Sequence, residues 1–292
     1  MEVNQHKLEA IRPKIWHRTK FIPEIRFGNK KIIEAFRLFE PKHKSVIVNY
    51  FDLKNRGYFE PKKAKNLREE LGFPDAVILS SVGTDRSLDK LSVDEYHKAA
   101  LMIKADAVTT IDDYIYLIDN EYPQFQLRNF VRAKSRTRKL LELSNGSYTV
   151  FGLVIGKDTN QIQDYMKFLA NCGINDFVFP CGDLLKNNSP DLKLIKTFLA
   201  LAKDLGRWNL LLGINSIKIL SKLEFDCYST NQWYFDAVHN RVYKNQKIVD
   251  ARKINIDSKY LSTDTDTTLS LHNLNECHSF SMNFGGYDGR NA

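Results

Sequence analysis

Carboxylates that follow short apolar segments are the residues of this chain best suited to chemistry. Asp226 stands in the segment KLEFDCYSTNQW, where apolar residues lead to the acid and small polar residues follow it. Asp112 follows the apolar segment 106–111 in a similar way. Two carboxylates that different strands bring to one mouth suit nucleophilic or acid–base work at an acetal-like carbon. The structural alternative is that Asp226 is a helix cap or loop acceptor, and that Asp112 and Asp113 cap the helix that follows them.

Short segments rich in β-branched and aromatic residues alternate along the chain with stretches of helical periodicity. The clearest helical stretches are Thr159–Asn171 and 191–205, and Gly173 and Gly206 follow them just before the next strand. Such alternation indicates βαβ units and an α/β fold; eight strands predict a closed (β/α)8 TIM barrel, with an open doubly wound sheet as the alternative. The predicted strands are 22–27, 45–51, 76–81, 106–111, 148–155, 176–180, 209–214 and 224–229.

In a barrel of this kind the working side chains come from the carboxyl ends of the strands. Polar residues stand at several of the predicted strand ends, with Asp112 and Asp226 as the two expected catalytic acids. The residues that we expect to bind substrate around them are Asn49, Ser81, Asp113, Cys181 and Gly182.

The composition predicts a protein with a sizeable core and an anionic partner. The chain has 292 residues, of which 43% are hydrophobic, and a formal net charge of +8. No apolar run reaches the length of a membrane span, the N-terminus lacks the apolar core of a signal peptide, and four scattered cysteines show no disulfide framework. We therefore expect a cytoplasmic protein with reduced thiols, no membrane association, and an affinity for nucleic acid.

The sequence suggests three parts. Residues 1–21 are polar and basic and predict an arm, residues 22–255 predict the barrel, and residues 256–292 predict a C-terminal loop and tail. A small hairpin is expected over 241–251, and the Ser/Thr/Asp-rich stretch 262–270 is expected to be a loop.

Two groups of basic residues are candidates for contacts with nucleic acid. One lies in a predicted helix, where such residues can contact successive phosphates, although a solvated helix face is the alternative. The other follows the second predicted strand, close to the expected mouth of the barrel. The residues concerned are Arg128, Arg132, Lys134, Arg136 and Arg138 in the first group and Lys54 and Arg56 in the second.

Five segments, taken in order, resemble the tRNA-guanine transglycosylase superfamily. They are VNYFDLKNRG (48–57), ILSSVGT (78–84), LSVDEYHKAALMIKADAVTTIDD (91–113), FGLVIG (151–156) and FDC (225–227), and the likeness covers roughly residues 22–255. The superfamily includes tRNA enzymes and relatives that insert 7-deazaguanines into DNA. The resemblance implies that Asp226 is the nucleophile that attacks C1′ of the target guanosine, that Asp112 binds the guanine edge, and that Asn49 lies near the nucleophile.

The chain departs from the family pattern at several positions. Ser81 stands where the family has an acid, Val154 and Ile155 replace a glutamine pair, and Pro180 and Cys181 replace two glycines. The family's zinc module is missing, because no Cys-x-Cys-x-x-Cys occurs in the sequence. We therefore expect neither a metal nor another cofactor.

The expected function is exchange of guanine for a 7-deazaguanine in nucleic acid through an Asp-linked glycosyl-enzyme. DNA is favoured over tRNA, since the sequence lacks both the zinc module and an appended RNA-binding domain. The expected partners are DNA or tRNA, the 7-deazaguanine base, and a protein partner. Two alternatives remain: a non-catalytic subunit that binds nucleic acid or a partner enzyme, and a barrel enzyme that acts on a small phosphorylated or glycosidic substrate.

Overall fold

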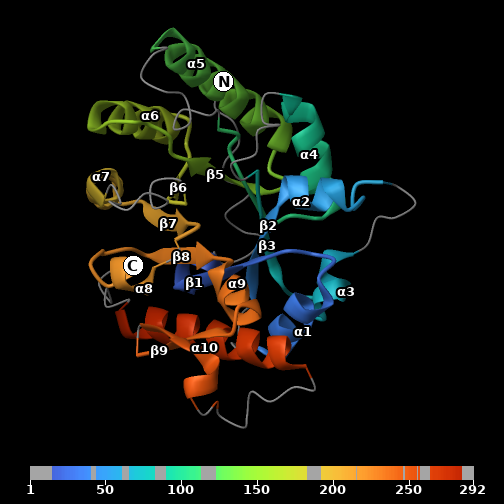
Figure 1. Cartoon of the computed structure of the whole chain (residues 1–292). Helices are drawn as coiled ribbons and strands as arrows, with labels where there is room; N and C mark the ends of the chain where they lie inside the picture. Colours follow the sequence, from blue (N-terminus) through green and yellow to red (C-terminus); the bar gives the residue numbers. More distant parts are fainter. Residues whose placement is uncertain are drawn as a thin grey trace.

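Eight parallel strands pair in chain order and close into a barrel, because the last strand, β8, pairs with the first, β1 (Figure 1). This computed structural model describes residues 15–40, 44–60, 66–82, 90–112, 123–182, 192–214, 216–245, 247–254, 256 and 264–284. The predicted (β/α)8 barrel is confirmed. Its strands are β1 Phe21–Ile25, β2 Ser45–Asn49, β3 Val77–Ser81, β4 Ala107–Thr109, β5 Thr149–Leu153, β6 Asp176–Pro180, β7 Trp208–Leu212 and β8 Cys227–Thr230.

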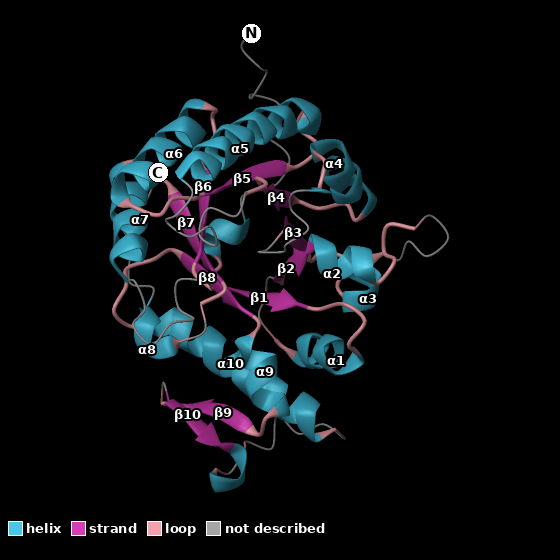
Figure 2. Ribbon diagram, turned by 45° about the horizontal axis from the view of Figure 1, so that its top comes forward, coloured by secondary structure: helices cyan, strands magenta, loops and turns pink. Residues whose placement is uncertain are grey.

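Helices surround the barrel (Figure 2). The sequence shows why they start where they do: Asp158, for example, caps α6 by accepting a hydrogen bond from Gln161 N at 2.9 Å. The helices are α1 Lys30–Leu38, α2 Tyr50–Asn55, α3 Leu67–Leu71, α4 Val93–Met102, α5 Pro123–Ser144, α6 Thr159–Asn171, α7 Leu192–Asp204, α8 Ile217–Leu220, α9 Gln232–Val238 and α10 Thr265–Phe284, with short 3-10 helices at Ile15–Arg18 and Ala251–Lys253. None of the helices in these described ranges is long and apolar enough to cross a membrane.

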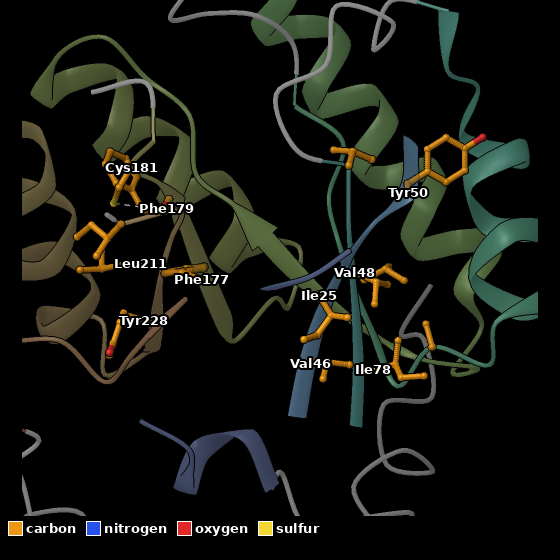
Figure 3. Close-up of a cluster of buried hydrophobic side chains, with 14 of the residues drawn as sticks. Ile25, Val46, Val48, Tyr50, Ile78, Phe177, Phe179, Cys181, Leu211 and Tyr228 are labelled. Atoms are coloured by element: carbon orange, nitrogen blue, oxygen red, sulfur yellow. Dashed lines mark hydrogen bonds between the residues drawn. The ribbon is translucent and has the colours of Figure 1, made fainter. Parts of the chain in front are cut away.

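Alternation along each strand divides the apolar side chains into two layers. In β2, Val46 and Val48 face the helices, whereas Ile47 faces the inside of the barrel. Figure 3 shows the outer layer, in which Val46 and Val48 lie near Ile78, and Phe179 lies near Cys181. Both faces of the strands are buried, as a parallel sheet requires.

The amino end of the barrel is closed by the segment that precedes β1. Trp16 is buried in the inner layer, where its ring meets Phe151 edge-on at 5.4 Å between centroids. His17 stacks on Trp208 and its Nε2 lies 2.6 Å from Oδ1 of the buried Asp176. The end of the expected basic arm is therefore part of the barrel's core.

The C-terminal region differs from the prediction of a loop and tail. A hairpin of β9 Arg241–Lys244 and β10 Lys247–Asp250 is present as expected, but it is followed by the 20-residue helix α10, which packs against α1 and α9. The helix carries many Thr, Ser and Asn residues, and these concealed it in the sequence. Several of them are buried and bonded: Asn273 Nδ2 donates to Trp233 O at 3.0 Å and to Arg241 O at 3.1 Å.

Candidate active site at the barrel mouth

Polar side chains occupy the inner face of the barrel near the carboxyl ends of four adjacent strands, β8, β1, β2 and β3. Each follows a residue of the inner apolar layer by two positions, so alternation turns it toward the inside as well. Asn49 and Ser81 are also paired in register between β2 and β3. These inward polar residues are Ser229, Glu24, Asn49 and Ser81.

Glu24 is the carboxyl group of this set. The residue is of intermediate exposure, and its Oε1 accepts a hydrogen bond of 3.0 Å from the Oγ of the fully buried Ser229. Burial raises the pKa of Glu24, while Ser229, the charge of Arg26 and the backbone of Gly213 act in the opposite direction. The result is a carboxyl group that is held in one position and ionises less readily than usual.

Asp112 lies at the same end of the barrel, three residues after the last residue of β4. Its side chain is only 4% exposed. It contributes to a raised pKa of about 12 at the hydroxyl of Tyr96, an effect whose largest cause is burial of that tyrosine. Asp112 thus follows the carboxyl end of β4, and its buried side chain lies near Tyr96, a residue of the outer apolar layer. Asp113 lies outside the described residues.

Asp226 does not lie at the mouth, contrary to our expectation. It directly precedes β8 and therefore belongs to the amino end of the barrel. Its Oδ2 accepts hydrogen bonds from the backbone N and the side-chain Nδ2 of Asn209 at 3.0 and 2.6 Å, and its own N donates to Asn209 Oδ1 at 3.0 Å. Asp226 joins the starts of β7 and β8, and it does not share a mouth with Asp112.

The structure shows what surrounds three of the residues that we expected to bind substrate. Asn49 caps α2 by accepting from Asp52 N at 3.1 Å, and its Nδ2 donates to Val82 O at 3.4 Å. Cys181 belongs to the outer apolar layer, where burial raises the pKa of its thiol, so it faces the helices and not the mouth (Figure 3). Gly182 follows β6, with its Cα 3.7 Å from the position that a Cβ on Gly213 would occupy.

The basic residues of α5 do not form one stripe. Lys134 and Arg138 lie over the ring of Phe168, with Nζ and Cζ at 5.4 and 5.3 Å from its centroid, and so face α6. On the other side of α5, Arg136 Nη2 donates to Leu91 O at 3.1 Å, close to the start of α4. Arg132 is partly buried, and Arg128 is exposed.

The second basic group lies on the carboxyl side of β2. Lys54 forms an ion pair with Glu95 at 2.7 Å, and Arg56 Nε lies 3.2 Å from Asp52 Oδ1. Both side chains are more than a third exposed, so these pairs leave them within reach of a ligand.

The fold places the chain in the class of (β/α)8 barrels, and solved structures of that class are similar to it. They include the YdjI aldolase from Escherichia coli K12 (12% identity, TM-score 0.51, 94% of each chain covered). A putative fructose-1,6-biphosphate aldolase from Coccidioides immitis gives 10% identity and a TM-score of 0.53 over 91% of this chain and 94% of that one. N-acetylneuraminate lyase from Mycoplasma synoviae gives 10% and 0.50 over 77% and 74%.

At identities this low the likeness shows the fold alone. No protein-family model matches the sequence, and no curated protein matches it significantly. The site must therefore be interpreted from its own residues.

Sequence reasoning missed Glu24 and Ser229. A signal for Glu24 was present, because the segment Phe21–Ile25 holds one acid among apolar residues and alternation with Ile22 turns it inward. Ser229 lay at the end of the predicted eighth strand, but Asp226 was taken as the working residue of that strand, whereas β8 begins only at Cys227.

Proposed function

We propose that the chain is a barrel enzyme that replaces guanine by a 7-deazaguanine in nucleic acid, DNA more than tRNA, with Glu24 facing the sugar and Asp112 binding the base. The observation that carries the proposal is the presence of two carboxyl groups, from β1 and from the end of β4, at the carboxyl end of one barrel. The resemblance to the guanine transglycosylases supplies the substrate class.

Glu24 takes the role that we had expected for Asp226. Asp226 is engaged with Asn209 at the amino end, whereas Glu24 is inward-facing near the carboxyl end and oriented by Ser229. A carboxyl group with a raised pKa is a stronger base and nucleophile, once ionised, than one in water.

The exchange has two balanced halves. Ionised Glu24 attacks C1′ of the target guanosine, the C1′–N9 bond breaks, and the departing guanine takes a proton from solvent. The incoming 7-deazaguanine then loses the proton on its ring nitrogen, attacks C1′, and breaks the ester bond to Glu24. The phosphodiesters stay intact, and neither an oxidant nor a reductant is consumed.

Asp112 suits recognition of the base. An ionised aspartate only accepts hydrogen bonds, which matches the N1–H and exocyclic amine of guanine. The purine must leave its stack to reach the mouth, and Leu153 and Leu212 offer an apolar wall on the side of the barrel opposite the polar strands. Lys54 and Arg56 stand near the same end and favour an approaching phosphate backbone.

The test is a search for the covalent intermediate. The purified chain is incubated with guanine-containing single-stranded DNA or with tRNA and a labelled 7-deazaguanine; adduct formation is followed by intact mass and exchange by retained label. Glu24→Gln should form no adduct and retain no label, and Asp226→Asn should still do both. Exchange at the wild-type rate by Glu24→Gln would refute the proposal, and absence of any adduct with wild-type chain would favour the non-catalytic subunit.

A further inference from the structure

A pocket of about 520 Å³ lies beside the barrel mouth, and the proposed reaction does not account for it. It is lined by Gly28, Asn29, Lys30, Lys31, Arg56, Tyr234 and Asp266. These residues come from segments that follow β1, β2 and β8, and from the start of α10, so the pocket lies on the same end of the barrel as Glu24. Its volume is in the range of small-molecule sites.

The walls of the pocket are held by contacts between distant segments. Asn29 Nδ2 donates to the Tyr234 hydroxyl at 2.6 Å. Lys31 Nζ lies 2.6 Å from Asp266 Oδ2 and 3.1 Å from Asp264 Oδ1, which raises the pKa of the lysine and joins α1 to α10. The pocket is therefore built by the fold and is not a gap between loose side chains.

Arg56 is positioned against Gly28. Its Nε binds Asp52, and a methyl group on Gly28 would come within 2.5 Å of Arg56 Nη1. Gly28 has φ +81°, a left-handed conformation that suits glycine, so this position needs glycine for both conformation and space. Gly28 and Arg56 both line the pocket.

The hydrogen-bonding state of Tyr234 points to an acceptor. Its oxygen accepts from Asn29, and within the part of the chain that the structure describes its own proton is left for a further acceptor. The lining also has three cationic side chains, of which Lys31 is paired with Asp266 and Asp264 and Arg56 is paired with Asp52, while Lys30 is exposed. The backbone amides of the first turn of α1 do not add hydrogen-bond donors to the pocket, because Lys31 N and Ile32 N already donate to the Asn29 side chain.

We propose that this pocket binds a phosphate group of the substrate. A guanidinium fork, an ammonium group and a phenol proton around one volume match the oxygens of a phosphate better than the two oxygens of a carboxylate. Gly28 is four residues beyond Glu24 along the chain, so the pocket lies at the same end of the barrel as the proposed reacting carboxyl group. The inference rests on the proposed function if the phosphate is a diester of nucleic acid; a small phosphorylated ligand has the same chemistry.

The experiment measures binding in the absence of the exchange reaction. Two probes are used with the full chain: a labelled single-stranded DNA oligonucleotide, followed by anisotropy over a salt series, and inorganic phosphate, followed by its effect on Tm. The variants are Arg56→Gln, Lys30→Gln and Tyr234→Phe. Lys222→Gln is the control, since Lys222 is on the surface and lies before β8 at the amino end. Acetate replaces phosphate as a carboxylate control.

We expect Arg56→Gln and Lys30→Gln each to weaken DNA binding roughly tenfold, and to reduce the salt dependence by about one released ion, while Lys222→Gln changes neither. Tyr234→Phe keeps the charge and the shape of the pocket and should weaken binding several-fold. It therefore provides a test even if Arg56→Gln fails to fold, which circular dichroism would show.

The outcomes separate the sources of the phosphate. Weaker binding of DNA, with or without weaker binding of phosphate, supports a backbone diester, and weaker binding of phosphate alone supports a small phosphorylated ligand. Wild-type affinity of the three variants for both probes overturns the proposal, as does equal stabilisation by acetate and phosphate. Glu24→Gln should bind both probes normally, so failure of the pocket and failure of the proposed chemistry are distinguishable.

Discussion

Ser229 Oγ on β8 donates a hydrogen bond to Glu24 Oε1 on β1, 3.0 Å away, at the seam where the last strand of the barrel pairs with the first. The carboxyl group on the inner face of β1 is thus oriented by a fully buried hydroxyl. The carboxyl group is oriented only when the barrel closes, because it lies on β1 and the hydroxyl that orients it lies on β8.

The Ser229 hydroxyl should set the acid limb of the pH profile. Burial raises the pKa of Glu24 and the Ser229 hydrogen bond lowers it, so Ser229→Ala should raise that pKa further. Since the reaction needs ionised Glu24, the acid limb of the exchange rate should move to higher pH while the plateau is nearly kept. Ser81→Ala is the control that leaves the limb in place, and a limb that moves to lower pH in Ser229→Ala would contradict the assignment.

Removal of the Glu24 charge should stabilise the fold near neutral pH. The folded state holds the Glu24 proton more tightly than the unfolded chain, in which the pKa of this group is about 4.5. Protonation of Glu24 therefore stabilises the folded state fully when the pH is below the pKa of the unfolded chain. This stabilisation is lost as the pH rises through the raised pKa of the folded state. Glu24→Gln should have a higher Tm than wild type near neutral pH, and the difference should vanish in acid; Glu142→Gln, near the end of α5, should show neither effect.

Asp226 should prove important for stability and not for chemistry. Asp226→Ala leaves the backbone N and Nδ2 of Asn209 without this acceptor, and the loss should be about 1–3 kcal/mol in the free energy of unfolding. Urea denaturation measures the loss, and exchange per folded molecule should stay near wild type. A variant that is as stable as wild type but forms no adduct would return the nucleophile's role to Asp226.

Gly28→Ala should weaken both the fold and the proposed phosphate pocket. The left-handed backbone disfavours alanine by about 1–2 kcal/mol, and the new methyl group would displace the Arg56 guanidinium. Gly206→Ala is a matched control, because Gly206 also has a positive φ, +65°, but a methyl group there would meet nothing within 4 Å. Both variants should lose stability in urea, and only Gly28→Ala should lose affinity for DNA.

The fold was predictable because each strand carries its own local signal. The sixth strand and the helix Thr159–Asn171 were predicted with the bounds that the structure shows, since apolar runs and a helical period are properties of neighbouring residues. The site was harder to predict, because it depends on where a strand begins. The segment 224–226 alternates in hydrophobicity with the strand that follows it, so the eighth strand was predicted three residues too early, and Asp226 was assigned to the wrong end of the barrel.

Burial of polar residues limited the prediction in the C-terminal region. The Thr, Ser and Asn residues of α10 have the composition of a loop, and only the partners supplied by distant segments make their burial favourable. Asn273, for example, bonds to the backbone of Trp233, Arg241 and Tyr243. Because these partners lie far away in the sequence, a pattern of neighbouring residues does not reveal them.

The closed amino end has a practical consequence for spectroscopy. Of the three tryptophans in the chain, Trp16 and Trp208 both lie inside the barrel, and both rings contact Phe151, so their emission reports on the barrel floor. Replacing Trp233 by Phe leaves those two as the only indoles. A red shift of the tryptophan emission that precedes the loss of helical signal during unfolding would then record the departure of the segment Ile15–Arg18. The intrinsic fluorescence would thus show, without a label, when water first enters the barrel.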